Sequence, residues 1–194
     1  MDPYGIYHVM TRGNHRETVF PSDDHIARYC FLLDRVTTRR RWIVLDWVVM
    51  PNHIHLVVQL TDGGLSEGMR ELNGCYSRWS HAIDGLTGTG HLVKNRFRAK
   101  VVDTEPYLLE LLRYLPLNPV RIGMAATAAD WRWSGFRAIA GLDHPRPFHH
   151  SSEALRHFGS SPQEARWVYQ QHVRSGLGQA EQDPWSDDMV ESAL

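Results

Sequence analysis

The stretch from Arg41 to Leu60, RWIVLDWVVMPNHIHLVVQL, decides the fold. Two runs rich in β-branched and aromatic residues, 42–49 and 53–60, flank Met50-Pro51-Asn52, which has the composition of a turn. The stretch therefore predicts a β-hairpin. The two-residue period of its second strand places His53 and His55 on one face, where two imidazoles form a partial metal site. The same spacing also fits two histidines on a half-exposed sheet face, and a metal site needs a third ligand.

Strand and helix patterns alternate on both sides of this hairpin. A strand is predicted over residues 4–11, with Ile6 and His8 on one face, and a strand or hairpin over 91–102. Helices are predicted from residue 22 to about 36, from 66 to about 83, from 104 to about 115, and over about 162–175. Pro116 and Pro119 are expected to disturb or end the third of these helices. This order of elements predicts an α+β fold with helices packed on a mostly antiparallel central sheet.

Composition is that of a soluble globular protein: 194 residues, 42% hydrophobic and 22% charged. The chain has only two cysteines, which excludes a disulfide framework. Its N-terminus lacks the pattern of a secretory signal, and Asp46 interrupts the longest apolar stretch, so no segment is apolar enough to span a membrane. We therefore expect a cytoplasmic protein without a membrane segment. Charge divides the chain, because residues 1–142 carry 17 Lys and Arg against 14 Asp and Glu, and residues 143–194 carry 4 against 8. We predict one domain over 1–142, followed by a C-terminal extension (143–194) with one helix and an acidic tail.

Tyr114 and Asn118 lie four residues apart on the third predicted helix, so their side chains share a face if the helix continues past Pro116. A tyrosine and an amide oxygen there could complete a site with the two histidines. The alternative is a core aromatic residue and a helix C-cap. Tyr107, one heptad earlier, is a rival nucleophile that we expect to pack near the helix start.

Several blocks of sequence resemble one known family. Residues 49–58 resemble the HUH motif of the single-tyrosine transposases, in which U is a hydrophobic residue, and residues 107–121 resemble their tyrosine-bearing helix. Further similar blocks are Thr11–Asn14, Gly90–Phe97 and Asp130–Ser134. Together the blocks span about residues 5–142 and resemble the REP-associated tyrosine transposases most closely.

The resemblance implies a role for each matching position. His53, His55 and Asn118 would bind a divalent metal, Mg²⁺ or Mn²⁺, and Tyr114 would be the nucleophile. Pro116 departs from the family pattern, because relatives usually carry a residue with an amide hydrogen there. The implied fold is the ferredoxin-like arrangement of HUH endonucleases with a C-terminal helical extension. The implied activity is cleavage and joining of single-stranded DNA through a covalent 5′-phosphotyrosine.

The resemblance also implies a partner. The substrate would be a REP-like DNA hairpin with a 5′ guide tetranucleotide. The protein would be associated with the nucleoid and bind as a monomer, with a dimer as the alternative. Residues that could contact phosphates, all but one of them basic, lie in the first turn, on the second helix and along the strand before Val101. They are Arg12, Asn14, Arg70, Arg78, Lys94, Arg96, Arg98 and Lys100. For each of these residues alone, the alternative is an ordinary solvated side chain. Trp79, Trp131 and Trp133 could stack on unpaired bases, and the alternative for them is burial in the core.

Three other functions stay open on sequence alone. The first is a protein of the same fold that binds hairpin DNA without cutting it, which Pro116 favours. The second is a rolling-circle replication initiator, which the lack of a helicase domain disfavours, and the third is a generic metal-dependent hydrolase. His144, His149, His150 and His157 suggest a second metal site or a plain loop.

Overall fold

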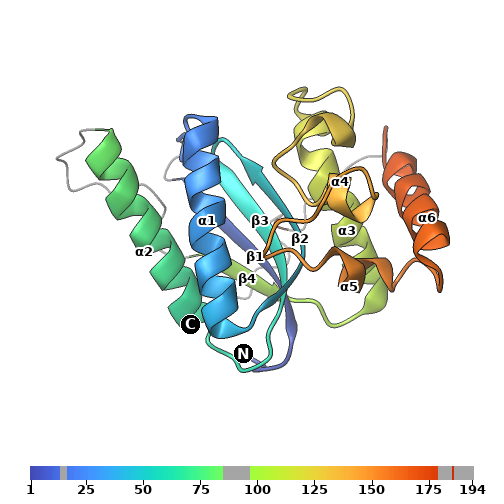
Figure 1. The fold of residues 1–194 in the computed structure, drawn as a ribbon, viewed down its shortest axis with the longest axis horizontal. Helices are drawn as coiled ribbons and strands as arrows, with labels where there is room; N and C mark the ends of the chain where they lie inside the picture. The colour runs from blue at the N-terminus through green and yellow to red at the C-terminus, as the bar shows by residue number, and fades with distance from the viewer. Residues whose placement is uncertain (14–16, 85–96, 179–184, 186–194) are drawn as a thin grey trace.

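The hairpin of residues 41–60 forms half of a four-stranded antiparallel sheet (Figure 1). This computed structural model describes residues 1–13, 17–84, 97–178 and 185. Strands β1 (Ile6–Arg12), β2 (Ile43–Met50), β3 (His53–Gln59) and β4 (Arg98–Val101) lie in the order β2-β3-β1-β4. With helices after β1 and β3, this is a ferredoxin-like arrangement, and the predicted α+β class with a mostly antiparallel sheet is confirmed.

The strand register decides which side chains share a face with the two histidines. Met10 of β1 pairs with His55, and Arg12 pairs with His53. Residues directly opposite on neighbouring strands point to the same side of a sheet. The histidine face therefore also carries His8, Arg98 and Lys100.

Helices α1 (Asp23–Arg40) and α2 (Leu65–Ile83) cover the opposite face of the sheet (Figure 1). The apolar stripe predicted for the first helix, from Ile26 to Val36, is buried there. Trp42, Trp47 and the alternate residues Tyr7 and Val9 of β1 belong to the same core. This face of the sheet is therefore buried in an apolar core, and the two histidines lie on the other face.

The histidine face is covered by α3 (Glu105–Arg121), with shorter helices beside it. These are α4 (Phe136–Ile139), α5 (Ser151–Leu155), α6 (Pro162–Ser175) and a 3-10 turn, Ala128–Asp130. Leu111 and Leu112 of α3 pack in one core with Val57 of β3 and Tyr169 of α6. The C-terminal extension thus shares its core with the rest of the chain, and the boundary at 142 stays a prediction.

Helix α3 runs through both of its prolines and ends at Arg121. Of the expectation that Pro116 and Pro119 disturb or end this helix, the second part is therefore wrong. Each proline lacks one N–H and so removes one i→i−4 hydrogen bond, but both rings are buried, and packing of the apolar face supplies most of a helix's stability. At its start, Thr104 Oγ1 accepts a hydrogen bond from the amide N of Tyr107 at 3.4 Å.

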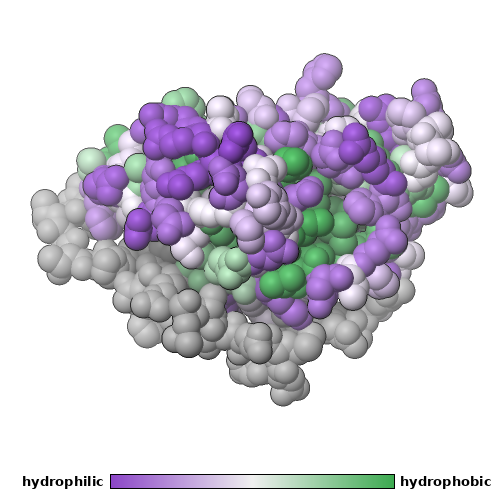
Figure 2. Space-filling model, turned by 90° about the horizontal axis from the view of Figure 1, so that it is seen from below, coloured by the Kyte–Doolittle hydropathy of each residue, from purple (hydrophilic) through white to green (hydrophobic). Residues whose placement is uncertain are grey.

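Hydrophilic residues make up most of the described surface in Figure 2, with an apolar area near the middle of that face. Within the described ranges, no helix is long and apolar enough to cross a membrane. Cys30 and Cys75 are both free, as the sequence predicts.

Candidate active site

His53 and His55 point from β3 toward α3, on the face that the two-residue period predicts. Their ring centroids lie 4.9 Å apart. His55 is 2% exposed, whereas His53 is half-buried. Burial, helped by His8, His53 and Arg12, lowers the pKa of His55 well below its usual value, so the imidazole is neutral. Neutral imidazole is the form that binds a metal.

Each of these rings uses Nδ1 for a contact inside the protein. His53 Nδ1 donates to Oδ1 of Asn52 at 2.6 Å. His55 Nδ1 lies 2.9 Å from Nε2 of His8, which is fully buried. Metal-binding histidines are typically held in this way, with one ring nitrogen hydrogen-bonded to the protein and the other directed to the ion.

Tyr114 of α3 completes an aromatic cluster with these histidines. Its ring lies 5.7 Å from His55 and 6.4 Å from His8, both edge to face. The side chain is 6% exposed. Seven residues further along α3, the Arg121 guanidinium lies 5.4 Å from the Tyr114 ring centroid, so a cation stands beside the phenol.

Asn118 lies one helical turn after Tyr114 because α3 continues past Pro116. Its Nδ2 donates to the backbone oxygen of Tyr114 at 3.0 Å. Among the described residues, none donates a hydrogen bond to Asn118 Oδ1. This oxygen is therefore suited to act as a ligand, on the same helix as the tyrosine.

The donors suit a divalent cation with mixed nitrogen and oxygen ligands. In the part of the chain that the structure describes, no three His, Cys, Asp or Glu residues group closely enough to hold a metal. The predicted set is instead the imidazoles of His53 and His55 plus the amide oxygen of Asn118, and it stays a prediction. Two imidazoles and one amide oxygen would occupy three positions of a six-coordinate cation and leave the others to substrate oxygens.

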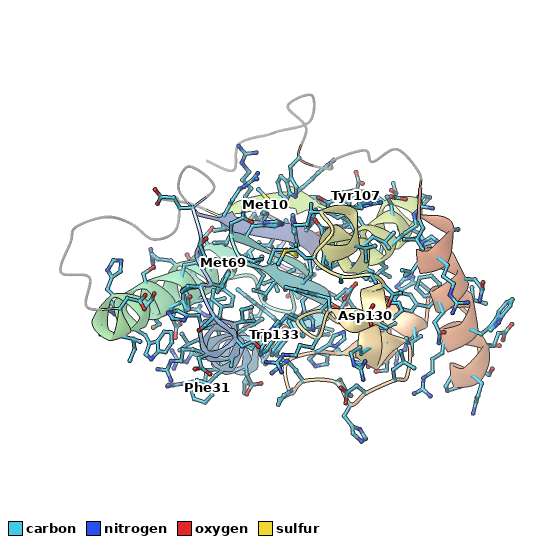
Figure 3. All side chains as sticks on the ribbon, turned by 90° about the horizontal axis from the view of Figure 1, so that it is seen from above. Met10, Phe31, Met69, Tyr107, Asp130 and Trp133 are labelled. Atoms are coloured by element: carbon cyan, nitrogen blue, oxygen red, sulfur yellow. The ribbon has the colours of Figure 1, made fainter. Side chains whose placement is uncertain are left out.

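Tyr107, the rival nucleophile, makes no ring contact with the histidines among the described residues. Lys100 Nζ stands 4.6 Å from its ring centroid, and the ring packs on the edge of the α3 core. Burial raises the pKa of Tyr107 to about 12, which disfavours a phenolate at neutral pH. Figure 3 shows Tyr107 on α3.

The structure groups only part of the predicted DNA-binding set. Arg12, Arg98 and Lys100 lie on the histidine face. Arg70 and Arg78 are exposed on α2, which packs on the other face of the sheet. Asn14, Lys94 and Arg96 lie outside the described residues.

The tryptophan and histidine motifs near the C-terminus are structural in this fold. Trp133 is buried, and Trp131 Nε1 donates to the backbone oxygen of Val49 at 3.0 Å. His149 Nε2 lies 3.2 Å from the backbone oxygen of Leu45. His157 lies 3.1 Å from Glu105, so these two histidines serve different contacts and the loop interpretation holds for them.

Three neighbours of the site, His8, Arg121 and Trp185, were not predicted from the sequence. His8 could have been found only from the pairing of β1 with β3, which the alternation within β1 does not reveal. Arg121 carries a weak signal, since a residue seven after Tyr114 returns to nearly the same helix face. Trp185, whose ring lies 4.8 Å from His8, stands in the acidic tail, whose other residues from 179 onward are not described.

Comparisons with known proteins bear on the family and the fold of this chain. The family profile described as "Transposase IS200 like" matches residues 4–116, more than half of the chain. The REP-associated tyrosine transposase of Escherichia coli (strain K12) is 24% identical over 125 residues, which cover 63% of this chain and 70% of that protein. A solved structure of a REP-associated tyrosine transposase bound to a REP hairpin matches 75% of this chain and 84% of its own, with a TM-score of 0.60 at 20% identity. That likeness shows the fold.

Proposed function

Because this chain belongs to the family of IS200-like transposases, we propose that it is a metal-dependent endonuclease and strand transferase for single-stranded DNA. One observation carries the proposal: β3 and α3 bring His55 and Tyr114 within 5.7 Å, with His53 and Asn118 as their near neighbours in sequence. A phosphodiester is anionic, so a site that cleaves it needs a nucleophile together with positive charge. In this cluster the nucleophile would be Tyr114, and the positive charge would come from a metal ion bound by the histidines.

Tyr114 is the proposed nucleophile. Its phenolic oxygen attacks the scissile phosphorus, the phenolic proton is lost, and the P–O3′ bond breaks. The products are a 5′-phosphotyrosine on the protein and a 3′-OH on the released strand, after the leaving oxygen takes up a proton. A free tyrosine has a pKa of about 10, so only on the order of one in a thousand is ionised at neutral pH. Arg121, whose guanidinium lies 5.4 Å from the ring centroid, places a positive charge beside the nucleophile.

His53, His55 and Asn118 are the proposed metal ligands. A bound Mg²⁺ or Mn²⁺ supplies Lewis-acid polarisation of the scissile phosphate. The protein's own part is to hold the ligand atoms in place, through Asn52 on His53 and His8 on His55. Strand joining reverses the attack with a new 3′-OH, and the phosphotyrosine bond conserves the energy of the broken linkage.

The proposed substrate is a REP-like hairpin with a 5′ guide tetranucleotide, bound by a monomer. Support comes from the E. coli relative, named for its association with REP, and from the solved structure bound to a REP hairpin. Arg12, Arg98 and Lys100 would contact phosphates on the histidine face, and Lys94, Arg96 and Asn14 would extend this contact. Arg70 and Arg78 would contact a part of the DNA that reaches α2.

The test uses Tyr114→Phe with Tyr107→Phe as its matched control on the same helix. Labelled hairpin oligonucleotides from the chain's own genomic flanks are incubated with Mn²⁺ or Mg²⁺, and covalent protein–DNA adducts are resolved on denaturing gels. We expect Tyr114→Phe to lower adduct formation at least about a thousandfold, because the covalent route is lost. Hairpin affinity should be unchanged, Tyr107→Phe should form adduct, and EDTA should abolish adduct formation in every variant.

The same experiment separates cleavage from binding alone. An adduct that persists in Tyr114→Phe would place the nucleophile elsewhere. Tight hairpin binding by the unmodified protein without an adduct in either metal would instead show a protein that binds DNA without cutting it.

A further inference from the structure

A second basic feature lies at the outer edge of β2, away from the histidine face. It is a hollow of about 240 Å³, lined by three arginines, Arg132, Arg137 and Arg146, and by one carboxylate, Asp143. Trp47 forms part of its wall. We call it the Arg146 hollow. Even with Arg132 and Arg137 each paired to a carboxylate, one guanidinium is left over, which favours an anion in the hollow.

Arg146 is the arginine best prepared to bind. Its Cζ lies 4.8 Å from the ring centroid of Trp133 and 5.6 Å from that of Trp47. Both rings are buried, so they form a rigid support for the guanidinium. Stacking on aromatic faces restricts an arginine to few rotamers while its N–H groups keep their capacity to donate.

The charges of the other two arginines are already paired. Arg132 forms an ion pair with Asp23 of α1, and Arg137 forms one with Asp143 at 3.5 Å. Among the described residues, no carboxylate lies within ion-pair distance of Arg146. The half-buried guanidinium of Arg146 is therefore the uncompensated charge of the hollow.

Backbone contacts attach the hollow to the sheet. Val49 N donates to the oxygen of Trp133 at 2.9 Å, and Gly135 N donates to the oxygen of Trp47 at 2.8 Å. Val48 pairs with His55 on one side and forms a bridge with Ser134 on the other. Two strand spacings, roughly 10 Å, therefore separate the backbones of His55 and Ser134.

The hollow lies at the edge of the sheet, with Trp47 on one wall and Arg137 and Ala138 of α4 on another, and its aromatic support comes from the face opposite the histidines. Trp47 and Trp133 are part of the core under α1 and α2, and Figure 3 shows Trp133 beside α1. A phosphate in the hollow is consequently not the phosphate that Tyr114 attacks.

We infer that the Arg146 hollow binds a phosphate group of the DNA backbone outside the cleaved linkage. That the ligand is DNA rests on the proposed function. The planar fork of a guanidinium matches two oxygens of a phosphate, and pairing with a phosphate releases condensed counterions. The hollow contributes to holding DNA and leaves the chemical step to the histidine face.

Arg146→Gln tests this inference against Arg174→Gln, which removes the same charge from an exposed position on α6. Affinity for the hairpin is measured by fluorescence anisotropy over a range of salt concentrations. Loss of one phosphate contact should weaken binding several-fold and lower the slope of log K against log salt by about 0.7–0.9. Adduct formation at saturating DNA should match the unmodified protein, and Arg174→Gln should leave the affinity and the slope unchanged.

Wild-type affinity and slope in Arg146→Gln would overturn the inference, as would equal losses in both variants. Arg146→Lys keeps the positive charge but lacks the planar guanidinium, so its affinity for the hairpin should lie between those of the unmodified protein and Arg146→Gln. This second variant keeps the inference testable if Arg146→Gln does not fold. Inorganic phosphate, titrated by calorimetry, separates the sources of the ligand. Phosphate binding that Arg146→Gln abolishes while DNA affinity stays intact would overturn the DNA assignment. Failure of the unmodified protein to bind any hairpin would refute the proposed function, and with it this assignment.

Discussion

His8 and His55 share a hydrogen bond of 2.9 Å in a region from which solvent is almost absent. Burial and Lys100 lower the pKa of His8 to about 3, so both rings are neutral at neutral pH. Only one proton can lie between two neutral imidazoles. If His55 carries it on Nδ1 and donates to His8, then His55 Nε2 presents a lone pair to a metal. If His8 donates instead, His55 Nε2 is protonated and cannot bind one.

We therefore expect His8→Phe to weaken Mn²⁺ binding about 10–100-fold, since it removes the acceptor that selects the metal-binding tautomer. His8→Gln retains an amide oxygen as acceptor and should recover part of the affinity. Calorimetric titration of the DNA-free protein with Mn²⁺ measures both. Equal Mn²⁺ affinity in His8→Phe and the unmodified protein would show that His8 does not orient His55.

Two glycines of α2 show how a helix is set against the sheet. A Cβ on Gly68 would lie 2.4 Å from Cζ2 of Trp42, so only glycine permits this approach. A Cβ on Gly74, in the same helix, would meet nothing closer than 3.5 Å, and there only the mobile end of Arg78. The same substitution at these two positions should therefore have opposite effects.

We expect Gly68→Ala to destabilise the protein by roughly 1–3 kcal/mol through overpacking. Gly74→Ala should stabilise it by about 0.5–1 kcal/mol, because alanine is the better helix former. Urea unfolding followed by circular dichroism gives both values. A stabilised Gly68→Ala would mean that Trp42 has room to move, contrary to the packing seen here.

Pro116 tests the continuity of α3. Because the helix already joins Tyr114 to Asn118 through this proline, restoring the missing N–H should change little at the site. We expect Pro116→Ala to alter the rate of adduct formation by less than about tenfold, a change worth about 1.4 kcal/mol. A gain of several orders of magnitude, measured on the same hairpin, would show that the proline does impair cleavage.

Buried titratable groups make the stability of the whole molecule depend on pH. Burial lowers the pKa of His149 to about 4, and the side chain is 4% exposed. A group whose folded pKa is lowered stabilises the fold above its unfolded pKa of about 6.5, and this stability is lost as the pH falls toward the folded pKa. Burial raises the pKa of Asp46 well above its usual value, so Asp46 has the opposite effect and opposes stability as the pH rises.

The His149 contribution can be isolated with His149→Gln, which cannot titrate. The difference in unfolding free energy between the unmodified protein and this variant should fall by about 2 kcal/mol between pH 7 and pH 5. Urea titrations at the two pH values measure this difference. A difference that does not change with pH would mean that His149 keeps an ordinary pKa in the fold.

At the scale of the whole chain, local pattern predicted the elements well. The hairpin of 41–60, the helix starts near Asp23, Leu65, Glu105 and Pro162, and the common face of His53 and His55 all follow from periodicity and capping. These signals are local, because side-chain direction in a strand or helix depends only on position along it. The end of α3 could not be predicted in this way, since buried packing overrides the penalty of two prolines.

By itself, then, the sequence determined which residues could do chemistry and on which elements they lie. Only the tertiary structure decided what surrounds them. His8 reaches His55 because β1 pairs with β3, and Arg146 rests on two tryptophans because residues 131–149 pack along β2. Such contacts join residues far apart in the chain, and strand register and core packing set them. Neither leaves a periodic trace in a single sequence.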